Sequence, residues 1–120
     1  MENIIYNELR FQGFNVDAGV IDVSEKTEKK DVNGKAIYAQ KALEIDFIAT
    51  LGDQKYYIQS ALSMDDPQKA VQEKRSLNSV DDSFKKIVIT KSGLNVTKDD
   101  KGVMVVDLFE FLQRGLKSFE

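Results

Sequence analysis

The dipeptide Asn33-Gly34 constrains the fold of this chain more than any other feature, because it is the strongest short-range signal for a β-hairpin. Apolar residues alternate on both sides of it, as they do in half-buried strands. A second turn signal, Gly52-Asp53, precedes another strand-like segment. We therefore expect a three-stranded meander from Phe14 to Ser63. The charged stretch Glu25 to Lys35 mixes both signs and is typical of a solvated hairpin tip.

Helical patterns surround this meander. The first eleven residues have apolar side chains at helical spacing and are followed by Gly13, a typical helix stop. A second helix is expected from Pro67, after Asp65 and Asp66, because acids are favourable at the positive end of the helix dipole. Its apolar stripe is thin and consists of Ala70, Val71 and Leu77.

The last third of the chain predicts two more strands and a helix. Residues 86–90 contain an Ile-Val-Ile run suited to a strand that is buried on both faces, and 103–106 form a short apolar strand. The stretch between them is expected to be loop. A final amphipathic helix follows, with one apolar side made of Leu108, Phe111, Leu112 and Leu116. We predict a single domain, residues 1–120, that contains both helices and strands (α/β in the broad sense, α+β with a mixed sheet). Its element order is α-β-β-β-α-β-β-α.

Composition excludes several classes of chemistry. The chain has no cysteine and no histidine, which removes thiol nucleophiles, disulfides, the usual zinc sites and His-dependent triads. With 17 basic and 20 acidic residues its net charge is −3, so no strongly basic footprint for nucleic acid is present at the level of the whole chain. No apolar run is long enough for a membrane span and no signal peptide opens the chain, so we expect a cytoplasmic location and no membrane partner.

One carboxylate stands in an unusual place, inside an apolar strand. In the segment Leu43 to Phe47, strand alternation puts Glu44, Asp46 and Ile48 on one face and Leu43, Ile45 and Phe47 on the other. A hairpin centred on Gly52-Asp53 brings Gln59 opposite Asp46, within reach of one hydrogen bond or one shared ion. Because an unpaired buried carboxylate is costly, Asp46 needs a partner. The structural alternative is a carboxylate that faces solvent or is held by Arg75 or a lysine.

Glu8 is a second acid of interest, because it lies between the apolar helix positions Ile5 and Leu9. A glutamate on the surface of the helix is the alternative. The glycines form no phosphate-binding loop of either common pattern, so we expect no nucleotide site in this chain.

Four blocks of the sequence resemble the C-terminal domain of a large family of prokaryotic AAA+ ATPases of largely unknown role, which has the PD-(D/E)XK restriction-endonuclease-like fold. The blocks are ENIIYNELRFQGF (Glu2–Phe14), LEIDF (Leu43–Phe47), YYIQSA (Tyr56–Ala61) and SLNSVDDSFKKIVIT (Ser76–Thr90). The resemblance implies a restriction-endonuclease-like core. It also implies that the chain is a C-terminal fragment of a longer ATPase, whose N-terminal ATPase domain is its partner and alone uses ATP and Mg²⁺.

The resemblance also assigns site positions. Active nucleases of this fold use two acids to bind a divalent metal and a lysine to position the attacking water. Here Glu8 matches the helix acid and Asp46 the metal-binding Asp, but Gln59 stands for the second acid and Ala61 for the lysine. A glutamine adds no negative charge and an alanine cannot polarise water, so the metal-assisted route is lost. We expect no catalytic residue, no cofactor and no bound metal; if a metal binds, Asp46 and Glu8 are its ligands.

Three functional interpretations follow. The first is a non-catalytic accessory module of an AAA+ ATPase that contacts nucleic acid or a protein. The second is a metal-dependent nuclease with a shifted active-site constellation, in which Glu44, Lys69 or Lys74 replaces the acid and the lysine that Gln59 and Ala61 do not supply. The third is a scaffold that only packs against its own ATPase.

Overall fold

The computed structural model describes residues 1–62, 67–80, 83–91, 97–98 and 101–116, without the side chains of Glu25, Pro67, Lys69, Glu73, Thr97 and Lys98. Its elements, in chain order, are α1 (Glu2–Phe11), β1 (Asn15–Lys30), β2 (Ala36–Leu51), β3 (Gln54–Ala61), α2 (Pro67–Asn78), β4 (Lys85–Thr90), β5 (Thr97–Lys98), β6 (Val103–Asp107) and α3 (Leu108–Arg114). Of the helices in these ranges the longest has 12 residues, too short to cross a membrane.

The strands form one mixed sheet in the order β1-β2-β3-β4-β6-β5. The pairs β1–β2, β2–β3 and β5–β6 are antiparallel, whereas β3–β4 and β4–β6 are parallel. The predicted α+β class, the mixed sheet and the meander are therefore confirmed. The short strand β5 is an addition, because the sequence around it predicted only loop.

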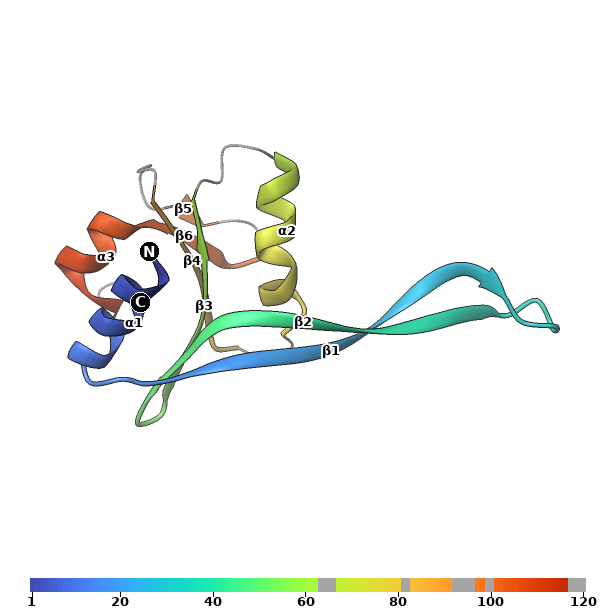
Figure 1. Ribbon diagram of the computed structural model, residues 1–120, viewed down its shortest axis with the longest axis horizontal. Coiled ribbons are helices and arrows are strands. Elements are labelled where there is room, and N and C mark those ends of the chain that lie inside the picture. The colour runs from blue at the N-terminus through green and yellow to red at the C-terminus, as the bar shows by residue number, and fades with distance from the viewer. Residues whose placement is uncertain (63–66, 81–82, 92–96, 99–100, 117–120) are drawn as a thin grey trace.

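Helices cover both faces of the sheet (Figure 1). On one face α1 and α3 enclose a first core that contains Ile5, Leu9 and Phe111, together with Phe47 and Ile58 from the sheet. On the other face α2 encloses a smaller second core. Its buried members are Ile45, Tyr57, Ala61, Leu77, Val88 and Val103.

The central strand β4 is buried on both faces, as the Ile87–Ile89 run predicted: these three residues are at most 1% exposed. The apolar stripe of α2 is thinner than predicted. Leu77 is fully buried, but Val71 is 70% exposed, because α2 presents a single narrow side to the sheet. Helix α3, predicted over residues 108–119, ends at Arg114, since Gly115 has a positive φ of 78° that interrupts the helix; residues 117–119 lie outside the described residues.

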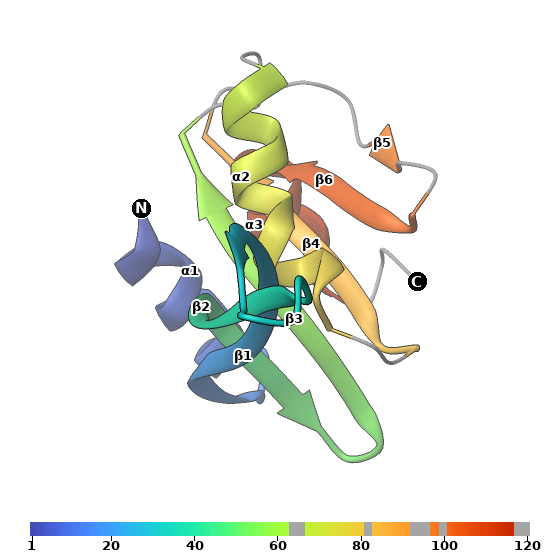
Figure 2. The same ribbon diagram turned by 90° about the vertical axis from the view of Figure 1, so that its right-hand side faces the viewer.

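The hairpin of β1 and β2 extends far beyond the rest of the sheet (Figure 1) and points toward the viewer in Figure 2. We call residues 20–44, which begin and end at the pair Val20–Glu44, the arm. The arm gives the molecule a longest dimension of 57 Å and a radius of gyration of 16.2 Å. A compact domain of this length has a radius of gyration of about 14 Å. The expected hairpin is present, and its tip turns at Asp31–Lys35.

Candidate functional site

The candidate site lies where β2 and β3 separate. The two strands pair from Leu51–Gln54 to Phe47–Ile58, in the register that the Gly52-Asp53 turn predicted. Beyond this point β2 pairs only with β1. Strand β3 remains paired with β4, for example at Gln59–Val88. We call the point of separation, formed by Glu44, Asp46, Gln59 and Ser60, the fork.

The Gln59 side chain forms hydrogen bonds with two backbone groups of β2 that lie beyond the last pair of the β2–β3 ladder. Its side-chain Oε1 accepts a hydrogen bond from the Asp46 N–H at 2.6 Å, and its Nε2 donates to the Glu44 carbonyl at 3.2 Å. The residue is only 7% exposed. Because unpaired buried backbone groups are costly, an amide that both donates and accepts suits this position. Asp46 and Gln59 are neighbours, as predicted, but they meet through the Asp46 backbone.

The Asp46 carboxylate performs the reciprocal task on β3. Its Oδ2 accepts from the Ser60 backbone N–H at 2.9 Å and from the Ser60 hydroxyl at 3.0 Å. The partner that Asp46 required is therefore Ser60, rather than Arg75 or a lysine. At the fork, two side chains thus form hydrogen bonds with backbone groups that strand pairing satisfies elsewhere in the sheet.

A β-bulge overturns the predicted strand faces. Between the pairs Asp17–Ile48 and Gly19–Ile45, β1 has one residue and β2 has two, Asp46 and Phe47. The extra residue breaks the two-residue alternation, so Ile45 and Ile48 contact the second core while Phe47 lies in the first. The expectation that Glu44, Asp46 and Ile48 share one face is wrong for this reason.

The acid of α1 that approaches Asp46 is Glu2. The Ser60 hydroxyl lies 3.2 Å from Glu2 Oε1, so one hydroxyl contacts two carboxylates. Glu8, the predicted helix acid, stands six residues and about 9 Å further along the helix. It accepts a hydrogen bond from Gln12 Nε2 at 3.0 Å. Helix spacing favoured Glu8 because it adjoins the buried Leu9, and no sequence signal places the first helical turn beside β3.

The remaining predicted site residues are Ala61, Glu44, Lys74 and Lys69. Ala61 is 6% exposed, belongs to the second core and has no cationic group of its own to place beside Gln59. Glu44 has an exposed side chain on the arm, and Lys74 is half-buried on α2. The side chain of Lys69 lies outside the described part of the chain. Among the described residues no three acids come together as a metal site would require. Glu2 and Asp46 form a pair of carboxylates, an arrangement that holds a divalent cation only weakly.

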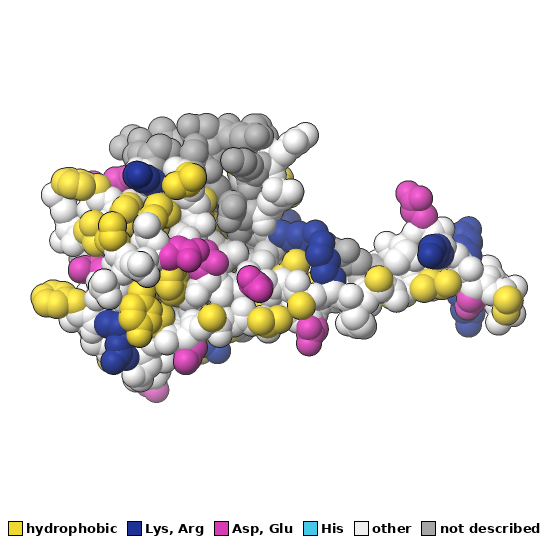
Figure 3. All heavy atoms as spheres, in the orientation of Figure 1, with side chains coloured by type: hydrophobic (Ala, Val, Ile, Leu, Met, Phe, Trp, Pro, Cys, Tyr) yellow, Lys and Arg dark blue, Asp and Glu magenta, His cyan; other side chains and the backbone are white. Residues whose placement is uncertain are grey.

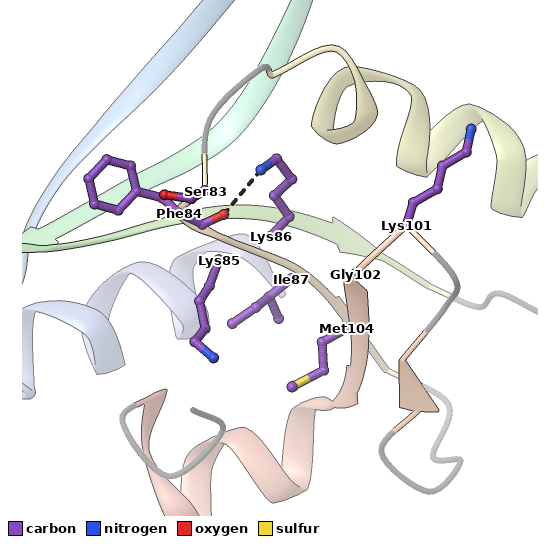
Figure 4. A pocket seen from close by; sticks show the side chains of 8 residues that line it. All are labelled: Ser83, Phe84, Lys85, Lys86, Ile87, Lys101, Gly102 and Met104. Carbon is purple, nitrogen blue, oxygen red and sulfur yellow. Dashed lines mark hydrogen bonds between the residues drawn. The ribbon is translucent and has the colours of Figure 1, made fainter.

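A hollow of about 280 Å³ lies at the other end of the sheet, where β4 and β6 begin. Its lining includes Lys85, Lys86 and Lys101, but their ammonium groups point in three different directions (Figure 4). Lys86 donates to the Phe84 carbonyl at 3.1 Å. Because the three charges do not converge, this hollow does not form an anion site.

The chain is similar to a protein of Haemophilus influenzae described only as an uncharacterized protein, with 30% identity over 112 residues. The match covers 93% of this chain but 22% of that relative, so the chain spans about a fifth of the relative's length. No family model and no solved structure matches the chain.

Proposed function

We propose that this chain is a non-catalytic accessory module with a restriction-endonuclease-like core, which works within a longer cytoplasmic AAA+ ATPase and mediates contacts with nucleic acid or protein. One observation carries the proposal. At the fork, where the resemblance puts a metal site, the side chains of Gln59 and Asp46 form hydrogen bonds with backbone groups: Gln59 with those of Asp46 and Glu44, and Asp46 with that of Ser60.

The chemistry of the fork supports an inactive site. A nuclease of this type needs negative charge to hold the metal and a cation to orient water. Gln59 supplies neither, and Ala61 is an apolar member of the second core. ATP and Mg²⁺ are proposed for the ATPase part of the parent protein only. The much greater length of the Haemophilus relative is compatible with a module inside a longer chain.

A metal-dependent nuclease is the second candidate, and the pair Glu2 and Asp46 favours it. Both carboxylates lie within hydrogen-bonding distance of the Ser60 hydroxyl. A cation between them would have two charged ligands, Glu2 and Asp46. The resemblance assigns Glu8 as the helix acid instead of Glu2.

The first experiment tests cleavage. We expect the 120-residue chain to leave plasmid DNA and RNA intact in the presence of Mg²⁺ or Mn²⁺. Cleavage that is lost in Asp46→Ala, and that a mock purification lacks, would overturn the proposal and favour the nuclease.

The second experiment restores the missing groups. Gln59→Glu combined with Ala61→Lys should strengthen Mn²⁺ binding about tenfold or more, measured by calorimetry, because it adds a carboxylate to those of Glu2 and Asp46. The arm offers a matched control with the same spacing, Gln40→Glu with Ala42→Lys, at two exposed positions. If the fork variant, folded by circular dichroism, binds Mn²⁺ no better than this control, the fork is not a metal-site remnant.

A further inference from the structure

The outer part of the arm carries a charge opposite to that of the rest of the chain. We call residues 26–41 the distal arm. It contains five lysines and two acids, a net charge of +3, which leaves 12 basic and 18 acidic residues, a net charge of −6, elsewhere. The lysines are Lys26, Lys29, Lys30, Lys35 and Lys41, and all five are exposed. Figure 3 shows Lys and Arg side chains gathered near the far end of the arm.

These lysines are available to a partner. Among the side chains that the structure describes, none forms an ion pair with them. One of the two acids, Asp31, is engaged in the tip itself: its Oδ1 accepts from the backbone N–H groups of Asn33 and Lys35, each at 2.9 Å.

The ladder of the distal arm contains a bulge. Between the pairs Lys26–Tyr38 and Lys30–Ala36, three residues of β1 lie opposite the single residue Ile37. The Thr27 hydroxyl donates to the Ile37 carbonyl at 2.6 Å and accepts from the Lys29 N–H at 3.3 Å. Bulges twist an edge strand away from pairing with another strand. The lysines are thus presented on a two-stranded ribbon in which the bulge disfavours pairing with a further strand.

One face of the arm combines cation, hydroxyl and amide groups. Residues directly opposite each other in a ladder share a face, so the pairs Lys26–Tyr38 and Ser24–Gln40 stand together. All four side chains are exposed, and Tyr38 is exposed to 60%. Such a face offers hydrogen bonds and a ring as well as positive charge.

We propose that the distal arm binds B-form duplex DNA, with the ribbon in the major groove and its lysines on the phosphates. The major groove admits a two-stranded β-ribbon, and lysine contacts to phosphate supply affinity without sequence preference. A second copy paired arm to arm is disfavoured, because two ribbons of charge +3 repel each other. This inference deepens the proposed accessory role, on which it rests, by naming the partner and the surface.

The test measures binding of the 120-residue chain to a labelled duplex by fluorescence anisotropy at several salt concentrations. Each phosphate contact contributes about −0.9 to the slope of log affinity against log salt. Lys29→Gln with Lys30→Gln should therefore flatten the slope by about 2 and weaken binding about tenfold at low salt. The control Lys91→Gln with Lys101→Gln, on the body, should bind like the parent chain.

A shortened arm tests the same surface without relying on individual lysines. Joining Asp22 to Ala42, which face each other in the ladder, through an Asn-Gly turn removes the distal arm and keeps the fork. This variant should retain a cooperative thermal transition and lose DNA binding. An RNA duplex should bind the parent chain more weakly than DNA, because the major groove of A-form RNA is too narrow for a ribbon.

Several results would overturn the inference: no salt-dependent binding by the parent chain, equal losses in the Lys91/Lys101 control, undiminished binding by the shortened arm, or equal binding of RNA. A change in self-association by light scattering, in place of a change in DNA binding, would show that the arm contacts a second copy. Binding without cleavage supports both proposals. Cleavage overturns only the non-catalytic role, and lack of binding overturns only the DNA surface.

Discussion

In the body of the molecule β4 runs between two parallel neighbours, and its residues Ile87–Ile89 are covered from both sides by helices. In the arm, by contrast, the described ladder joins only β1 and β2, as at the pair Lys26–Tyr38, and both outer edges of the ribbon are open. The two regions use the same hydrogen-bonded ladder. Their comparison shows that the ladder alone does not account for stability, because an isolated two-stranded ribbon is marginal in water.

The fork is the boundary between these two regions. On its inner side the backbone of β2 is paired on both edges, and on its outer side only with β1. Gln59 and Asp46 complete the hydrogen bonding at this boundary, so their side chains stabilise the point where the sheet divides.

The largest expected difference between the regions concerns equivalent isoleucines. Ile58→Ala in the first core, where Ile58 is fully buried, should lower the free energy of unfolding by about 2–5 kcal/mol. Ile37→Ala in the arm, where Ile37 is 40% exposed, should lower it by less than about 1 kcal/mol. Urea denaturation measures both. Equal losses would mean that the arm unfolds together with the body and is not a separate region.

A smaller effect is expected at the fork. Gln59→Leu removes the amide that serves the Asp46 N–H and the Glu44 carbonyl, and should cost about 1–3 kcal/mol, because buried backbone groups lose their partners. Exchange of the Asp46 amide hydrogen should accelerate as well. The matched variant Gln40→Leu, at an exposed arm position, should change stability by at most about 0.5 kcal/mol. Indistinguishable variants would remove the structural role assigned to Gln59.

The smallest effect is expected at the distal bulge. Thr27→Val keeps a β-branched side chain but removes the hydroxyl that joins Lys29 to Ile37. The Lys29 amide should exchange several-fold faster, whereas the free energy of global unfolding should change by less than about 1 kcal/mol, because the arm opens locally. Hydrogen exchange followed by NMR separates the two quantities. A loss of protection throughout β4 would contradict local opening.

The local elements and their order were predictable from the sequence, because their signals are local. Asn33-Gly34 and Gly52-Asp53 fixed the turns of the meander, and the second turn fixed the register that brings Asp46 to Gln59. The apolar run of β4 identified a central strand for the same reason: a strand covered on both faces has no polar side to display.

Only the tertiary structure decided which way the site residues face and which of them meet. The bulge at Asp46 and Phe47 reverses the alternation of β2, and it depends on how β1 pairs with β2, which periodicity within one strand does not encode. The choice of Glu2 over Glu8 depends on where the first turn of α1 packs against β3. The same holds for the fork, since it depends on where β2 separates from β3, which stays paired with β4 on its other edge. The sequence by itself thus determined the elements, the turns and the residue types at the site. Long-range pairing and packing decided their geometry, because those interactions join segments that are far apart in the chain.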